Sequence, residues 1–140
     1  MATQVPNRRL LRDNSPGMLQ TLAMPAAGAN NITTAFDIGA GPWHPEEIEI
    51  EIAVPALPAL VSTTDSITIT LYSAPDNVTF TAASPAVQLV IAGVATTGPA
   101  AQTVTIRPHI GIQRYVAFKQ VATSGAGNNT GVTVSYQILT

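Results

Sequence analysis

The sequence contains no cysteine, and this absence excludes disulfide bonds, thiolate nucleophiles and cysteine-ligated zinc sites. Charge is also scarce, because Asp, Glu, Lys and Arg make up 10% of the 140 residues, against about a quarter in typical soluble proteins. A surface so poor in charge is expected where a partner or further copies cover it. A simple threonine-rich surface is the alternative explanation.

Long apolar runs are missing as well. No stretch approaches the roughly 20 apolar residues that span a bilayer, and residues 1–17 lack the apolar core of a signal peptide. We therefore expect no membrane partner and synthesis in the cytoplasm. Three Asn-X-Thr sequons begin at Asn31, Asn77 and Asn128, and chance explains them best in a chain rich in threonine.

Charge is distributed unevenly along the chain. The net charge is +2 over residues 1–32, −7 over residues 33–106 and +3 over residues 107–140, which together give the overall −2. A nucleic-acid-binding protein usually presents a dense basic face. Three arginines near the N-terminus do not form one, so we expect no nucleic-acid partner.

Residues 1–32 show no sustained periodicity and are interrupted by proline and glycine, so we predict an extended N-terminal arm. The arm is too apolar for an idle linker. Its apolar residues are Leu10, Leu11, Met18, Leu19, Leu22 and Met24. It is expected to pack on its own domain, on a sister subunit or on another protein.

Residues 33–140 form the predicted domain, in which apolar and polar residues alternate with a period of two, as in half-buried strands. Eight short strands separated by turn signals predict an all-β antiparallel sandwich, with the eight-stranded jelly roll as the leading form. The predicted strands are Thr34–Ile38, Glu47–Val54, Ser66–Tyr72, Val78–Thr81, Val87–Ile91, Gln102–Arg107, Ile112–Val121 and Gly131–Leu139.

The second predicted strand carries Glu47, Glu49 and Glu51 alternating with isoleucines. A jelly roll with strands B to I builds one sheet from B, I, D and G and the other from C, H, E and F. Counted in order, the glutamate strand is C, beside strand H with Arg114 and Lys119. Cross-strand charge pairing would then neutralise the glutamates. Arg114 and Lys119 point to opposite faces of a regular strand, so both can contribute only across a bulge.

No catalytic or metal site is predicted, and no cofactor. Trp43-His44-Pro45-Glu46-Glu47 lacks the spacing of zinc ligands on a helix, and His109 lies in another loop. The three glutamates resemble glycosidase carboxylates only superficially, because such enzymes need a sugar cleft lined with aromatic residues. We interpret Trp43 as a buried anchor and His44 as a surface residue, and we do not expect an enzyme.

Three segments carry a resemblance to a known family. They are Ala35–Gly41, the strand and turn Ile67–Asn77, and a closing hairpin formed by Arg114–Lys119 and Val132–Tyr136. With these patterns, residues 33–140 resemble the small capsid decoration (cement) proteins of tailed phages, in particular the Bordetella-phage type. The N-terminal arm matches no part of that pattern.

The resemblance implies a homodimer or homotrimer on the outside of an icosahedral head, binding the major capsid protein and stabilising contacts between its subunits. It therefore implies a location in the virion. For the contacts with the capsid we predict Arg8, Arg9, Leu10, Leu11 and Arg12 of the arm. The alternatives are another virion β-sandwich, such as a head fibre base or tail component, and a carbohydrate-binding module.

Overall fold

The computed structural model describes residues 19–38, 48–83, 86–108 and 112–139. Over these ranges the chain forms strands and no helix, which confirms the all-β prediction. Ten strands occur: β1 (Leu19–Ala23), β2 (Asn30–Ile32), β3 (Phe36–Asp37), β4 (Glu49–Val54), β5 (Ser66–Ala74), β6 (Thr81–Ala82), β7 (Gln88–Ala92), β8 (Gln102–Ile106), β9 (Tyr115–Ala122) and β10 (Thr133–Leu139).

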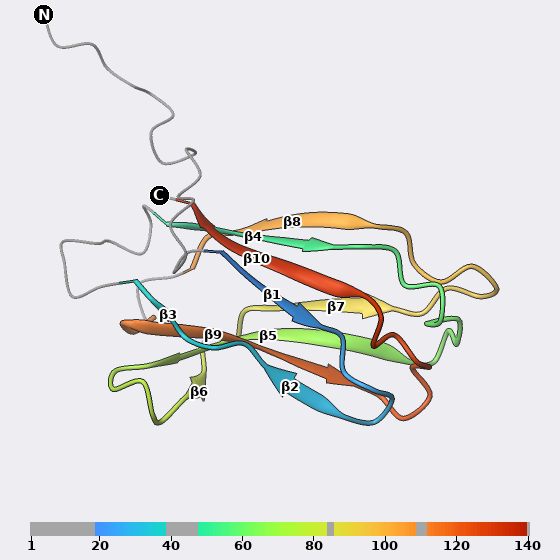
Figure 1. The fold of residues 1–140 in the computed structure, drawn as a ribbon, viewed down its shortest axis with the longest axis horizontal. Coiled ribbons are helices and arrows are strands. Elements are labelled where there is room, and N and C mark those ends of the chain that lie inside the picture. Colours follow the sequence, from blue (N-terminus) through green and yellow to red (C-terminus); the bar gives the residue numbers. More distant parts are fainter. Residues whose placement is uncertain (1–18, 39–47, 84–85, 109–111, 140) are drawn as a thin grey trace, which may run out of the picture.

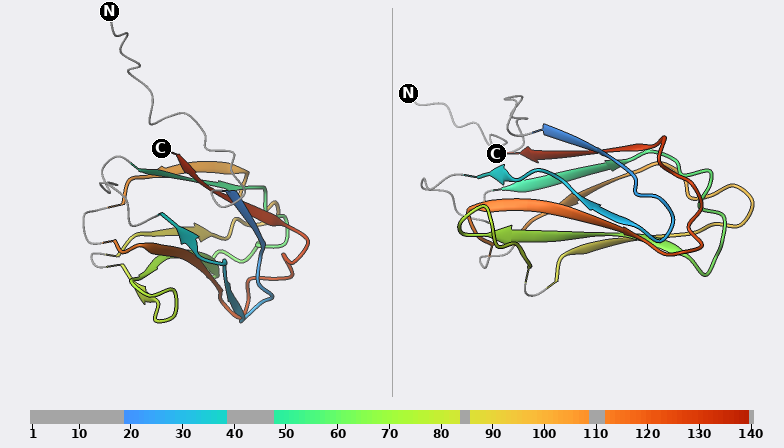
Figure 2. Two further views of the ribbon diagram at one scale, coloured as in Figure 1. Left: turned by 60° about the vertical axis from the view of Figure 1, so that its left-hand side comes forward. Right: turned by 60° about the horizontal axis from the view of Figure 1, so that its bottom comes forward.

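The strands form two antiparallel sheets that face each other as a β-sandwich (Figures 1 and 2). Sheet A has the order β1-β10-β4-β8. Sheet B has the order β2-β9-β5, with β3 also paired to β9, and with β6 and β7 both paired to β5. The two sheets are closed over a common core to which both contribute.

The arm predicted for residues 1–32 is wrong in its second half. β1 is an edge strand of sheet A, and β2 is an edge strand of sheet B. β1 was missed because Leu19 and Leu22 lie an odd number of positions apart and so point to opposite faces of the strand. Residues 1–18 lie outside the described part of the chain.

The period-two pattern explains how the core is filled. In β5 the inward Ile67, Ile69 and Leu71 are buried, and the threonines between them face outward. Phe118 of β9 stacks on Tyr136 of β10, with ring centroids 4.6 Å apart, and thus joins the two sheets. Burying each large apolar side chain contributes about 1.5–3 kcal/mol, so this cluster is the main stabilising contribution.

One buried polar network crosses between the sheets beside this aromatic pair. The Tyr136 hydroxyl donates a 2.6 Å hydrogen bond to Gln120 Oε1. Gln120 Nε2 in turn donates to the Ala23 carbonyl and to Asn31 Oδ1, both at 2.9 Å. Tyr136 and Gln120 are both fully buried, and burial raises the pKa of Tyr136 above its ordinary value. The network satisfies polar groups that would be costly to bury alone.

A second set of hydrogen bonds ties two loops together at one end of the sandwich. Asp65, just before β5, accepts from the Thr123 hydroxyl at 2.7 Å and from the Gly125 amide at 3.1 Å. A Cβ at Gly125 would lie 2.3 Å from Asp65 Oδ2, so a larger residue there would displace the carboxylate from this position. Hydrogen bonds from the hydroxyls of Ser62 and Thr123 hold the pKa of Asp65 below its ordinary value of 3.8.

Replacing Tyr136 with Phe should lower the free energy of unfolding by about 1–3 kcal/mol, because Gln120 Oε1 loses its buried donor. Urea unfolding at neutral pH measures this loss. Tyr72→Phe is the matched control, since Tyr72 lies on the outer face of sheet B and its loss should stay within about 0.5 kcal/mol. Equal losses for the two variants would contradict a stabilising role for the inter-sheet bond.

Lowering the pH should weaken the Asp65 contacts. The carboxyl has a lower pKa in the folded than in the unfolded chain, so its contribution is present above the unfolded value of 3.8 and is lost as the pH falls through the folded value. Unfolding free energies from about pH 6 to about pH 2 should therefore fall more steeply for wild type than for Asp65→Asn. Parallel curves would show that this carboxylate is not linked to folding.

Candidate interaction surfaces

The neighbours of the glutamate strand differ from the predicted ones. β4 pairs with β10 on one side and with β8 on the other, all within sheet A. The predicted neighbour, which carries Arg114 and Lys119, belongs to sheet B and pairs with β5. The predicted cross-strand pairing of Glu49 and Glu51 with Arg114 or Lys119 is therefore wrong. When β1 is left out of the count, the glutamate strand takes the place of the strand before it, and its predicted neighbour changes accordingly.

Glu49 instead forms an ion pair within sheet A. Its carboxylate Oε1 lies 2.5 Å from the Arg107 guanidinium, which follows the neighbouring strand β8. The Glu49 side chain is 5% exposed and that of Arg107 is 54% exposed. A nearly buried carboxylate is costly to desolvate, so this guanidinium is needed to hold its charge. Glu51 lies two residues further along β4, and its register partners are Gln137 and Thr105.

Arg114 and Lys119 have other partners, on sheet B. Arg114 makes two hydrogen bonds to the carboxylate of Asp37 in β3, at 2.9 and 3.0 Å, and both side chains are well exposed. The Lys119 ammonium lies 5.7 Å from the centroid of the Tyr72 ring, within cation–π range. Both cations thus have partners on the outer surface of sheet B. The basic residue that contacts the glutamate strand is Arg107, on sheet A.

Several residues singled out in the sequence lie outside the described residues. They are Arg8, Arg9, Leu10, Leu11 and Arg12 of the predicted arm, Trp43, His44 and Glu47, and His109. In the described ranges, no group of three or more His, Asp or Glu side chains could hold a metal ion, and no helix is long and apolar enough to cross a membrane.

The side chain of Asn31, which begins one of the three sequons, is hydrogen-bonded within the sandwich. Asn31 donates from Nδ2 to the Ala23 carbonyl at 2.8 Å and accepts from Gln120 at its Oδ1. Both polar atoms of this amide are therefore used in contacts within the sandwich.

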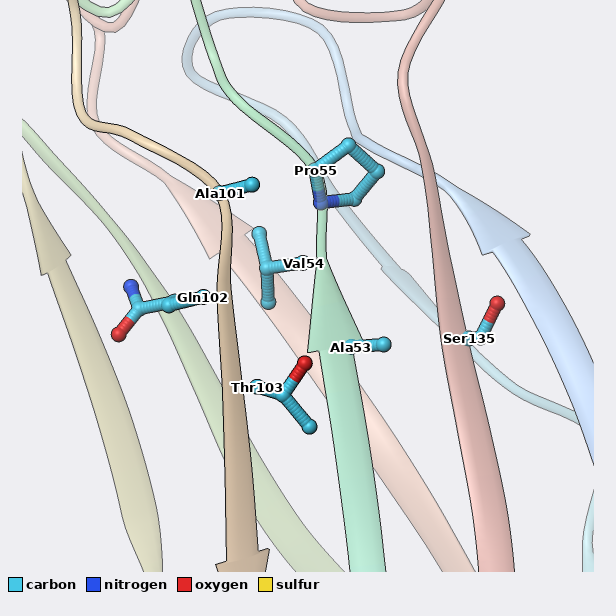
Figure 3. Close-up of a pocket in the computed structure, with 7 residues that line it drawn as sticks. All are labelled: Ala53, Val54, Pro55, Ala101, Gln102, Thr103 and Ser135. Atoms are coloured by element: carbon cyan, nitrogen blue, oxygen red, sulfur yellow. The ribbon is translucent and has the colours of Figure 1, made fainter.

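The outer face of sheet A has an open hollow that the sequence did not reveal (Figure 3). It measures about 360 Å³ and lies across β4, β8 and β10. Its lining residues are Ala53, Val54, Pro55, Ala101, Gln102, Thr103 and Ser135. Small side chains at Ala53 and Ser135, which are register partners, leave the sheet face low at this point.

The lining of the hollow determines which chemistry it can support. Its lining side chains are uncharged, and its polar groups are two hydroxyls and one amide. None of them is paired with a base that would activate a nucleophile, and none is an aromatic ring for sugar stacking. Acid–base catalysis would require ionisable groups, and the lining side chains of this hollow supply none.

Comparison with known proteins gives a likeness of fold. No family model matches the chain, and no curated protein matches it significantly. Among solved structures, the crystal structure of PBSX exported protein XepA is similar, with a TM-score of 0.53 and 16% sequence identity. The match covers 99% of this chain and 39% of the XepA chain, so the sandwich spans well under half of that protein's length.

Removing the Arg107 guanidinium should destabilise the fold. Arg107→Ala removes one charge-assisted contact of the nearly buried Glu49 carboxylate, and we expect a loss of roughly 2 kcal/mol in the free energy of unfolding. Arg107→Lys, which keeps the charge, should recover part of it. Arg114→Ala removes an exposed pair and should leave stability close to wild type. If urea unfolding ranked the two alanine variants in the opposite order, the importance assigned to the Glu49–Arg107 pair would be wrong.

Proposed function

We propose that the chain is a capsid decoration protein, which binds the outer surface of an icosahedral phage head and stabilises contacts between major capsid protein subunits. Three lines of support are the order of strands in the two sheets, the resemblance of residues 33–140 to tailed-phage decoration proteins, and the composition of the surface. The strand order carries the most weight, because the jelly roll inferred from it is the architecture that this family implies.

We infer that the sandwich is a jelly roll. The order in sheet A reads as B-I-D-G when β1, β10, β4 and β8 are taken as those strands. The order in sheet B reads as C-H-E-F when β2 and β3 are counted as one interrupted strand C and β6 and β7 as one interrupted strand F. Both interrupted strands lie on a single neighbour, which supports counting each as one. Ten observed strands thus reduce to eight.

The described surface suits adhesion to protein. On the outer face of sheet B, Val121 is in register with Thr68, and Thr68 with Val90 of the next strand. Both valines are exposed, as is Ile32 of β2. Lys119 is the charged residue nearest to them in the register, beside Ile32. Apolar side chains between threonines form weak contacts, and the many copies on a shell multiply such contacts.

The arginines near the N-terminus complete the proposal. We assign capsid attachment to Arg8, Arg9, Leu10, Leu11 and Arg12 on their sequence, because guanidinium groups bind carboxylates and backbone carbonyls through several hydrogen bonds. The structure sets where a test truncation should end. Since β1 begins at Leu19, removing residues 2–18 leaves every described strand in the chain, whereas a longer deletion would remove an edge strand.

Deleting residues 2–18 should abolish co-sedimentation with emptied capsids of the virus that encodes the protein, while the thermal midpoint of the sandwich stays near that of the full chain. The triple variant R8A/R9A/R12A should reduce capsid binding at least about tenfold, because it removes three cationic donors. The conservative variant R8K/R9K/R12K keeps the charge and should retain part of the binding.

A full-length protein that does not co-sediment with capsids would contradict the decoration role. Undiminished binding by the truncated protein would contradict the assignment to the arm and would move the attachment site to the sandwich. Circular dichroism of every variant separates a loss of binding from a loss of folding.

A further inference from the structure

The two lateral sides of the sandwich differ in how their edge strands are protected. On the side of β1 and β2, side chains tie the sheets together. Gln120 and Asn31 both donate to the Ala23 carbonyl at the end of β1, and Thr34 donates to Gln20 Oε1 at 2.6 Å. These bonds close that side of the molecule.

The opposite side ends in β8 of sheet A and in β7 of sheet B (Figure 1). β6 also pairs with β5 at this edge of sheet B. The edge formed by β6 and β7 is interrupted between Ala82 and Gln88. β8 is continuous, and within the described residues its ladder hydrogen bonds run only to β4. Among the described residues, the backbone donors and acceptors on the outer edge of β8 have no strand to pair with.

β8 lacks the features that usually protect an edge strand. Its sequence, Gln102-Thr103-Val104-Thr105-Ile106, contains no charged residue and no proline. Natural edge strands are commonly blocked by lysine, by proline or by a bulge, because an unblocked edge pairs with another chain. Its register with β4 is regular over all five residues, so no bulge turns the edge away.

We propose that β8 is a self-association edge, which pairs antiparallel with β8 of a second copy about a two-fold axis at Val104. This register sets Thr103 of one copy opposite Thr105 of the other, and Gln102 opposite Ile106. Sheet A would continue into the second molecule as one eight-stranded sheet. Such an interface is isologous, as expected of a two-fold dimer.

Three features favour a second copy over an unrelated strand. The strand is nearly palindromic about Val104, so the same register pairs threonine with threonine twice on the outer face. The inward Gln102, Val104 and Ile106 are half-buried in one copy and would become covered in the dimer. No like charges oppose each other, because the nearest charge, on Arg107, is neutralised by Glu49 of its own sheet.

The hollow of sheet A lies at the same edge. Continuing the register sets Arg107 of one copy opposite Ala101 of the other, and Ala101 and Thr103 line the hollow. The small side chains there leave room for the stem of the arginine and for the threonine beside it. The space beside Ala101 and Thr103 thus fits the proposed register at both ends of the pair of β8 strands.

Variants at positions 103 and 105 test the pairing and its register. In T103K/T105K every new lysine opposes a lysine of the second copy, and dimerisation should weaken at least about tenfold, or 1.4 kcal/mol. In T103E/T105K each lysine opposes a glutamate, and the dimer should be retained. Both variants place the same lysine beside Glu51 of their own chain, so the effect of position 105 within one subunit is matched.

Sedimentation velocity over a range of concentrations, without capsids, is the measurement. Wild type should approach twice the chain mass of 14.5 kDa. A wild type that stays monomeric, or two variants that dimerise equally well, would overturn the proposal. The experiment needs no capsids. A failure of self-association would therefore be distinguishable from a failure of the decoration role.

Discussion

The hydrogen bond from Tyr136 to Gln120 is the constraint on which the arrangement of the two sheets depends. It lies in the fully buried interior, beside the stacked rings of Phe118 and Tyr136, and it joins sheet A to sheet B. A buried amide has more bonding groups than one partner can satisfy, so Gln120 also holds Ala23 and Asn31. The first two strands are thereby fixed along one side of the sandwich.

This closure makes the molecule asymmetric between its two sides. One side is secured by side chains that bond to backbone, and the other ends in a continuous uncharged strand with a small-residue hollow beside it. In the proposed role on a repeating shell, the secured side would keep the subunit folded and the other side would remain available for contacts. The proposed attachment through the arm and the proposed self-association use separate parts of the chain, so both can operate at once.

The two ion pairs of the described residues each join side chains of a single sheet. Glu49 and Arg107 neutralise each other on sheet A, and Asp37 and Arg114 do so on sheet B. The nearly buried Glu49 makes its pair important for stability, whereas the exposed pair on sheet B contributes little. Among the described residues, charged side chains thus pair with partners on the same sheet.

The sequence by itself determined the fold class and the course of most strands, because alternation along β5, β8 and β10 reports which side chains face the core. It did not determine which strands are neighbours. Because β1 was not counted, the glutamate strand β4 took an earlier place in the predicted order and was given the wrong basic partner. Pairing between Glu49 and Arg107, the contacts of Gln120 and the hollow beside Ala53 join residues far apart in the chain. Only the tertiary structure decided them, since local periodicity says which way a side chain points and not what it meets.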